Sequence, residues 1–289
     1  MTEYYSSDST IEFPIPRSLK NVLDSDEKYL NIILSPIRVC ANYRPKLGQR
    51  TSEGYTLEGF QKLYRADSFY TWFGLDNPLI YAAHKAAGGM TSVYRQIGIG
   101  CEHLFREILT DHLMLTSEQV NWSYEIPGTG NRKRKLSLDA RIPLENIQDT
   151  TARERVKAWI AAAAADLDVE PSIINSLTGA VFEVRQGYKS KDSKRQNADL
   201  ANAATAYTKS YFPCILVLSS QIDTDIVLRY RASKWFILTG MVGANDPLQS
   251  TYDFVKNVVG YDLAAFFERN SETIKNEVDV VLEALLSSK

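Results

Sequence analysis

Apolar and polar positions along the chain change their period several times, and each change marks a predicted element. Apolar residues three and four apart predict amphipathic helices, and apolar residues two apart predict strands. The predicted helices cover residues 25–37, 56–70, 91–115, 151–167, 192–207, 223–231, 251–259 and 262–287, and the predicted strands cover residues 120–126, 136–142, 179–184, 214–218 and 235–239. This order predicts an α/β fold with a mixed sheet flanked by helices.

The predicted elements divide the chain near residue 90. Pro36 is expected to end the first helix, because proline cannot donate a backbone hydrogen bond. The aromatic residues Trp72 and Phe73 are expected to anchor their segment on the core. We therefore expect a tail and helical region packed on the core over residues 1–90, and the core with its C-terminal helices over residues 91–289.

Two glycines interrupt the predicted helix over residues 91–115. Gly98 and Gly100 each cost about 1 kcal/mol relative to alanine inside a helix. Their presence predicts that another part of the chain packs closely there. Glu102 follows directly and lies close to the apolar stripe of the helix, either as a solvated flanking residue or as part of a site.

The overall composition limits the classes of function. The 289 residues carry a formal net charge of −2, so any surface that binds nucleic acid must be a local basic patch. The three cysteines have no CxxC spacing, which argues against a disulfide framework or a zinc site and fits a cytoplasmic protein. No apolar run approaches the roughly 18 residues of a membrane span. The polar start of the chain is not expected to act as a signal peptide.

The stretch from Gly179 to Asp199 carries the most unusual charge pattern. Glu183 and Arg185 interrupt an apolar strand and point to the same face, because they are two residues apart. Buried charges are costly unless they are paired or bind a metal, so these two either neutralise each other or belong to a site. Beyond Gly187 the chain becomes strongly basic, which favours contact with a polyanion. The basic residues there are Lys189, Lys191, Lys194 and Arg195.

The predicted hairpin over residues 120–142 also leads from basic residues to an acid. Its tip carries Arg132, Lys133, Arg134 and Lys135, which form either a solvated turn or a phosphate-binding surface. Strict alternation in the second strand places Ser137, Asp139 and Arg141 on one face. It places Leu136, Leu138, Ala140 and Ile142 on the other face.

Asp139 and Glu183 therefore come from two strands of one predicted core. Two carboxylates are the hard oxygen ligands that Mg²⁺ prefers, and a bound Mg²⁺ assists phosphodiester hydrolysis. A nearby cation stabilises the charge that develops at the phosphorus. The sequence thus predicts a Mg²⁺-dependent site acting on a phosphodiester.

These motifs resemble the PD-(D/E)XK nuclease fold of restriction endonucleases. In that family an Asp and an Asp/Glu-x-Lys motif lie on adjacent strands, as Asp139 and Glu183-Val184-Arg185 do here. The run FEVRQGYKSKDSKRQNAD, residues 182–199, is most similar to the ApaLI-like type II restriction endonucleases. The resemblance covers roughly residues 91–240. It implies a restriction-endonuclease-like mixed-sheet core with N-terminal and C-terminal helical additions.

The resemblance assigns roles to individual residues. It implies that Asp139 and Glu183 are metal ligands, and that Glu102 matches the acidic residue many members place on the first core helix. Arg185 stands where the family has a lysine, and arginine stays charged and cannot act as a base. Lys189 is one candidate for the lysine role, and Gln186 is a candidate for orienting water.

The function implied by the resemblance is site-specific cleavage of double-stranded DNA with Mg²⁺, at a short palindrome of the GTGCAC type. Palindromic sites pair with two-fold symmetric proteins, so a homodimer is expected. A cognate methyltransferase is expected in the same restriction-modification system, without direct contact. Two alternatives stay open: a structure-specific or repair nuclease on the same core, and an inactive DNA-binding module, which the arginine at position 185 motivates.

Overall fold

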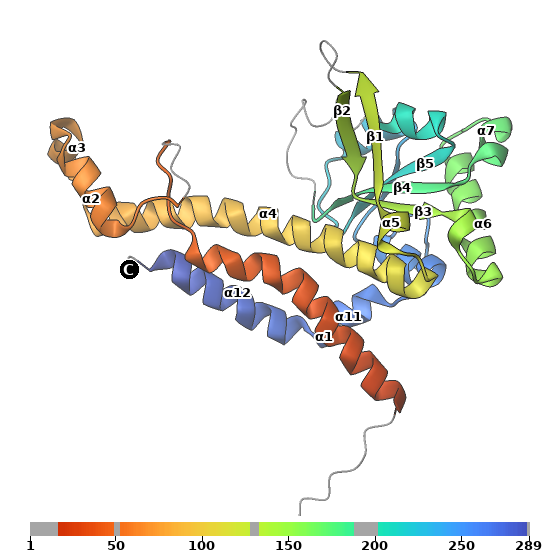
Figure 1. Ribbon diagram of the computed structural model, residues 1–289, viewed down its shortest axis with the longest axis horizontal. Helices are drawn as coiled ribbons and strands as arrows, with labels where there is room; N and C mark the ends of the chain where they lie inside the picture. The colour runs from red at the N-terminus through yellow and green to blue at the C-terminus, as the bar shows by residue number, and fades with distance from the viewer. Residues whose placement is uncertain (1–16, 49–52, 128–132, 188–201, 288–289) are drawn as a thin grey trace, which may run out of the picture.

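The computed structural model describes residues 17–48, 53–127, 133–187 and 202–287, without the side chains of residues 17–24, 126, 127 and 133–135 (Figure 1). The helices are α1 (Arg17–Arg38), α2 (Leu57–Arg65), α3 (Ser68–Trp72), α4 (Pro78–Leu113), α5 (Ser117–Val120), α6 (Thr150–Asp166), α7 (Pro171–Ser176), α9 (Thr224–Ala232), α10 (Thr251–Phe254), α11 (Leu263–Arg269) and α12 (Ser271–Leu286). Residues 202–208 are also helical. Short 3₁₀ turns, η1 (Val39–Asn42) and η2 (Leu144–Asn146), and a π-helical turn, η3 (Val255–Val259), complete the helical segments.

The strands form a four-stranded mixed sheet and a separate hairpin. The sheet has the order β3 (Ala140–Pro143), β4 (Gly179–Arg185), β5 (Tyr211–Val217) and β6 (Phe236–Leu238). β3 is antiparallel to β4, whereas β4, β5 and β6 are parallel. β1 (Trp122–Pro127) pairs with β2 (Lys133–Leu138) in the hairpin. The predicted mixed α/β architecture is confirmed.

The second strand of the predicted hairpin bends at Asp139, between β2 and β3. Leu138 packs with the side chains of Trp122 and Tyr124, whereas Ala140 and Ile142 pack in the other core. The predicted alternation, which placed Leu136, Leu138, Ala140 and Ile142 on one face, is therefore wrong. A residue at a bend does not keep the two-residue period, so the apolar face changes sides there.

The sheet separates two apolar cores. On one face, Phe182 and Val184 of β4 pack with α4, α6 and η3, where Trp159 lies between the aromatic rings. On the other face, Val181 packs with α9, the hairpin and the helical residues 202–208. β4 is thus buried on both faces, which explains its nearly continuous apolar sequence.

α4 is the longest helix, and it runs without a break across residue 90. It starts at Pro78, capped by Asn77, rather than near residue 91. α1 and α12 lie along it (Figure 1). Gly100 makes this packing close, because a Cβ there would come within 2.9 Å of the Ile33 carbonyl oxygen. Gly98 has no such neighbour, so the predicted close packing is confirmed at one glycine and wrong at the other.

Three local predictions are corrected by the structure. Pro36 lies inside α1 instead of ending it. It lies close to the C-terminal end of this helix, so the backbone hydrogen bond that proline cannot donate is lost only in the final turns of α1. Pro171 begins the short helix α7, which is not among the predicted helices, and proline suits the first helical turn. The predicted last helix is divided at Asn270 into α11 and α12.

The aromatic segment at α3 is also placed differently from the prediction. Trp72 is 80% exposed and Phe73 is 67% exposed, so neither anchors this segment on the core.

Within the described part of the chain, no helix has both the length and the apolar character needed to cross a membrane.

The two glycines of α4 give a matched pair of stability predictions. We expect Gly98→Ala to raise the free energy of unfolding by about 1 kcal/mol, because the helix gains propensity and the new methyl group meets open space. We expect Gly100→Ala to lower it by roughly 1–3 kcal/mol, because α1 must move away. Urea unfolding measures both changes. Equal effects at the two positions would contradict the close contact between α1 and α4.

Candidate active site

The bend at Asp139 places this residue against β4. Its backbone N–H donates to the carbonyl of Phe182 over 2.9 Å. Its carboxylate oxygen Oδ2 accepts from the backbone N–H of Val184 over 2.8 Å. The side chain therefore continues the hydrogen-bond ladder beyond the end of β3. As a result, the Asp139 carboxylate lies beside the backbone of Glu183.

Glu183 and Arg185 form a buried ion pair on one face of β4. The Arg185 Nη2 atom lies 2.5 Å from Glu183 Oε1, and the two side chains are only 7% and 12% exposed. The shared face and the pairing agree with the sequence prediction. Pairing alone does not decide between a structural ion pair and a site, because both need it.

Glu102 of α4 is electrostatically coupled to this pair of strands. Burial and the nearby Asp139 carboxylate raise the pKa of Glu102 to about 7, and the cations Arg106 and Arg185 partly offset this rise. The side chain is half-buried instead of standing in solvent as a flanking residue. The structure thus brings Glu102, Asp139 and the Glu183–Arg185 pair into one region.

Arg106 belongs to the same region and was not recognised from the sequence. Its Nη1 atom donates to the backbone carbonyl of Asp139 over 2.8 Å. It lies one helical turn after Glu102, so the two residues share a face of α4. This four-residue spacing was the available signal. Arg106 fixes α4 to the bend from which the Asp139 carboxylate extends.

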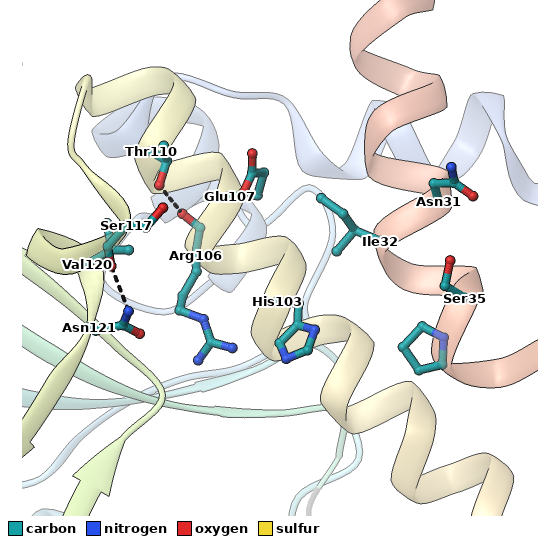
Figure 2. A pocket seen from close by; sticks show the side chains of 11 residues that line it. Asn31, Ile32, Ser35, His103, Arg106, Glu107, Thr110, Ser117, Val120 and Asn121 are labelled. Atoms are coloured by element: carbon teal, nitrogen blue, oxygen red, sulfur yellow. Dashed lines mark hydrogen bonds between the residues drawn. The ribbon is translucent and has the colours of Figure 1, made fainter. Parts of the chain in front are cut away.

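A pocket of about 580 Å³ opens next to Arg106, between α1, α4 and α5 (Figure 2). His103 faces the α1 side of this pocket, and Arg106 extends toward the strands (Figure 2). Burial and the Arg106 cation lower the pKa of His103, while Asp139 acts in the opposite direction. The other polar side chains that line the pocket are Asn31, Ser35, Glu107, Thr110, Ser117 and Asn121.

Other predicted site residues are only partly described. Gln186 is half-buried and directly follows β4, next to Arg185. Lys133, Arg134 and Lys135 belong to β2, but their side chains are not described. The predicted residues Arg132, Lys189, Lys191, Lys194 and Arg195 lie outside the described residues.

The donor atoms of this region suit Mg²⁺ better than a softer metal. Mg²⁺ is commonly bound through one or two carboxylates and keeps several waters, and two carboxylates are supplied here by Asp139 at the bend before β3 and by Glu183 of β4. Among the described residues, no group of three or more His, Cys, Asp or Glu side chains is arranged to hold a metal ion. Two carboxylates would leave the other coordination positions of a Mg²⁺ ion to water.

Comparisons of the chain with protein-family models, curated proteins and solved structures find no match. The assignment of function therefore depends on the residues and their geometry.

The raised pKa of Glu102 leads to a prediction about stability and pH. The folded state holds this proton more tightly than the unfolded chain, whose ordinary value is 4.5. The stability that this proton contributes is fully present below that value and is lost as the pH rises through about 7. We expect the urea midpoint of the wild type to fall across this range relative to that of Glu102→Gln, which cannot ionise.

Glu118→Gln is the control, because Glu118 is an exposed carboxylate on α5. This variant should keep the pH dependence of the wild type. An identical slope in the wild type and in Glu102→Gln would show that Glu102 ionises as it does in water.

Proposed function

We propose that the protein is a Mg²⁺-dependent endonuclease that hydrolyses phosphodiester bonds of double-stranded DNA, with Asp139 and Glu183 as the metal ligands. The observation that carries the proposal is the hydrogen bond from the Val184 N–H to the Asp139 carboxylate. It fixes an acidic side chain beside the Glu183-Val184-Arg185 segment. The PD-(D/E)XK resemblance requires this arrangement, in which the acidic side chain lies next to the strand that carries the second acidic residue.

A restriction-endonuclease-like fold is part of this proposal. Its support is the order of elements: α4 precedes the β1–β2 hairpin, β3 is antiparallel to β4, and β5 is parallel to β4 after a helical segment. α4 also packs against β4 and presents Glu102 to the same region. The ApaLI-like similarity of residues 182–199 further suggests a type II restriction endonuclease.

The chain's own residues have separate roles in the proposed reaction. Water attacks the phosphorus, one P–O ester bond breaks, and the leaving oxygen takes up a proton. Bound Mg²⁺ supplies Lewis-acid polarisation and makes hydroxide accessible at neutral pH. Arg185 stabilises negative charge at the phosphate but does not move a proton, because its guanidinium stays protonated. Glu102, whose pKa is about 7, holds or releases a proton near neutral pH.

Double-stranded DNA is the proposed partner because basic residues precede Asp139 and follow Glu183 in the sequence. The run Arg132–Lys135 at the hairpin and the basic residues that follow Gly187 supply phosphate contacts in a chain whose net charge is only −2. Recognition of a short palindrome of the GTGCAC type by a homodimer in the cytoplasm, alongside a cognate methyltransferase, follows from the type II resemblance. These points extend the proposal.

The second candidate function is a DNA-binding module without cleavage. The observation that favours it is the 2.5 Å ion pair between Arg185 and Glu183, since a paired arginine replaces the lysine of the family motif. A structure-specific or repair nuclease on the same core remains the alternative among enzymes.

Plasmid DNA incubated with the protein and Mg²⁺ separates the three. Discrete fragments indicate a restriction enzyme, smears or cleavage dependent on branched DNA indicate a repair nuclease, and retardation alone indicates a binding module.

We expect Asp139→Asn and Glu183→Gln each to abolish Mg²⁺-dependent cleavage while DNA binding in Ca²⁺ persists. Both changes remove a metal-ligand charge but keep the side-chain shape. Plasmid cleavage and gel retardation measure the two effects. Asp166→Asn is the matched control, because Asp166 lies at the end of α6 in an exposed ion pair with Arg231. A variant at 139 or 183 that cuts at the wild-type rate would remove that residue from the site.

We expect Arg185→Ala to reduce single-turnover cleavage by about 10²–10³ and Arg185→Lys to retain partial activity. Lysine keeps the charge but loses the planar fork of the guanidinium. Arg185→Ala also leaves Glu183 buried without this ion-pair partner, which should cost about 3–5 kcal/mol of stability. Urea unfolding distinguishes the loss of folding from the loss of chemistry.

Lys189→Ala tests the other candidate for the same role. If Lys189 supplies the essential cation, its alanine variant is inactive and Arg185→Lys cleaves at nearly the wild-type rate. Normal cleavage by both Lys189→Ala and Arg185→Ala would show that neither cation carries the third catalytic role.

A further inference from the structure

The end of the molecule opposite the sheet carries an exposed aromatic surface. α2 and α3 stand at the N-terminal end of α4, remote from the sheet (Figure 1). Large apolar side chains gather on α3, on Phe73 directly after it and on the first turn of α4, and we call them the aromatic arm. Their exposed fractions are 57% for Phe69, 39% for Tyr70, 80% for Trp72, 67% for Phe73 and 78% for Leu79.

The aromatic arm is a built surface and not a loose segment. The rings of Phe69 and Phe73 lie 4.9 Å apart, and Tyr70 stacks on Tyr64 of α2 at 4.8 Å. Asp67 caps α3 and Asn77 caps α4, so both helices begin at defined residues. The rings of Phe69, Tyr70 and Phe73 are therefore packed against neighbouring rings before any partner binds.

We infer that the aromatic arm is the surface through which two copies of this chain associate, an inference that rests on the homodimer of the proposed function. The area is the first argument. Aromatic side chains have roughly 150–250 Å² each to bury, so the exposed parts of the arm amount to about 600 Å² per copy. Two copies would bury about 1,200 Å² in total, which reaches the lower limit for a stable protein–protein interface.

Charge gives the second argument for a second copy. Residues 68–75, Ser-Phe-Tyr-Thr-Trp-Phe-Gly-Leu, contain no charged side chain, so two identical surfaces meet without like-charge repulsion. The charged residues that border this stretch in the sequence are Asp67, whose carboxylate accepts from the Phe69 N–H, and Asp76, which pairs with Arg65 over 3.0 Å. An uncharged aromatic centre inside a polar rim is the composition of a protein–protein interface.

The position of the arm has a consequence for the proposed sites. Leu79 and Glu102 are 23 positions apart on α4, which corresponds to about 35 Å at 1.5 Å per residue. The angle at which two α4 helices cross at the arm therefore sets the separation of the two sites along DNA.

Leu79→Glu tests the interface without threatening the fold. Leu79 is exposed in the first turn of α4, where a negative side chain favours the helix. Leu228→Glu is the matched control, because Leu228 is a 61% exposed leucine on α9 beside the sheet. In sedimentation equilibrium, the wild type and Leu228→Glu should have a molecular mass of twice 32.6 kDa. The dimer dissociation constant of Leu79→Glu should be at least about thirtyfold higher than that of the wild type.

Tryptophan fluorescence gives a second readout. Trp72 is the exposed tryptophan of the four, whereas Trp122, Trp159 and Trp235 are buried. Iodide should therefore quench the emission more strongly as the wild type is diluted into monomers. Phe73→Glu should show strong quenching at every concentration. In Leu228→Glu, quenching should depend on concentration as in the wild type.

Two outcomes would overturn the inference. One is a wild type that remains monomeric at about 100 µM, which is far above the Kd of a stable interface; in that case another protein or DNA covers the arm. The other is a dimer that Leu79→Glu and Phe73→Glu both leave intact. Sedimentation does not depend on catalysis, so a dimer that never cuts DNA contradicts only the nuclease proposal. A monomer that cuts DNA contradicts only the interface.

Discussion

The candidate site depends on how the carboxylate of Asp139 is held. This side chain accepts the Val184 N–H at the point where the strand bends from one core to the other. The bond does two things at once. It satisfies a backbone donor of a buried strand, and it directs an acidic group toward the segment that carries Glu183. Arg106 reinforces the bend from α4 by donating to the Asp139 carbonyl. The same contacts that join helix, bend and sheet therefore assemble the charged groups.

The charges gathered there are costly in a buried setting, and the structure offsets that cost by pairing. Glu183 is paired with Arg185, and both are almost fully buried. At Glu102 the cost of a buried charge is reduced by protonation, since the raised pKa lets this carboxyl group carry a proton near neutral pH. Strongly perturbed groups of this kind cluster at functional sites, although structural ion pairs perturb pKa values too. Burial is the main cause of the raised pKa of Glu102, and the Asp139 carboxylate adds to it. A cation bound at Asp139, such as the proposed Mg²⁺, would reduce this second contribution.

α4 connects this region to the remote aromatic arm. It contacts α1 and α12 along its length, packs on β4 near its C-terminal half, and carries α2 and α3 at its start (Figure 1). Gly100 permits the close contact with α1. Further ion pairs between distant parts of the sequence, such as Asp26 with Arg269 and Arg38 with Glu277, hold the surrounding helices together. This helix of 36 residues would therefore couple the geometry of the proposed association to that of the proposed site.

The sequence by itself determined the elements whose signal is local. Alternation and apolar runs identified the hairpin and the buried strands, and the two-residue spacing placed Glu183 and Arg185 on one face of β4. Tertiary structure decided the rest. No local period predicts that the apolar face changes sides at Asp139, because the bend arises from pairing with a strand some 45 residues later. The role of Arg106 likewise depends on a contact with a distant carbonyl. Trp72 was expected to pack on the core because it is aromatic. Burial of a side chain, however, depends on whether another element lies over it, and among the described residues no element covers the aromatic arm.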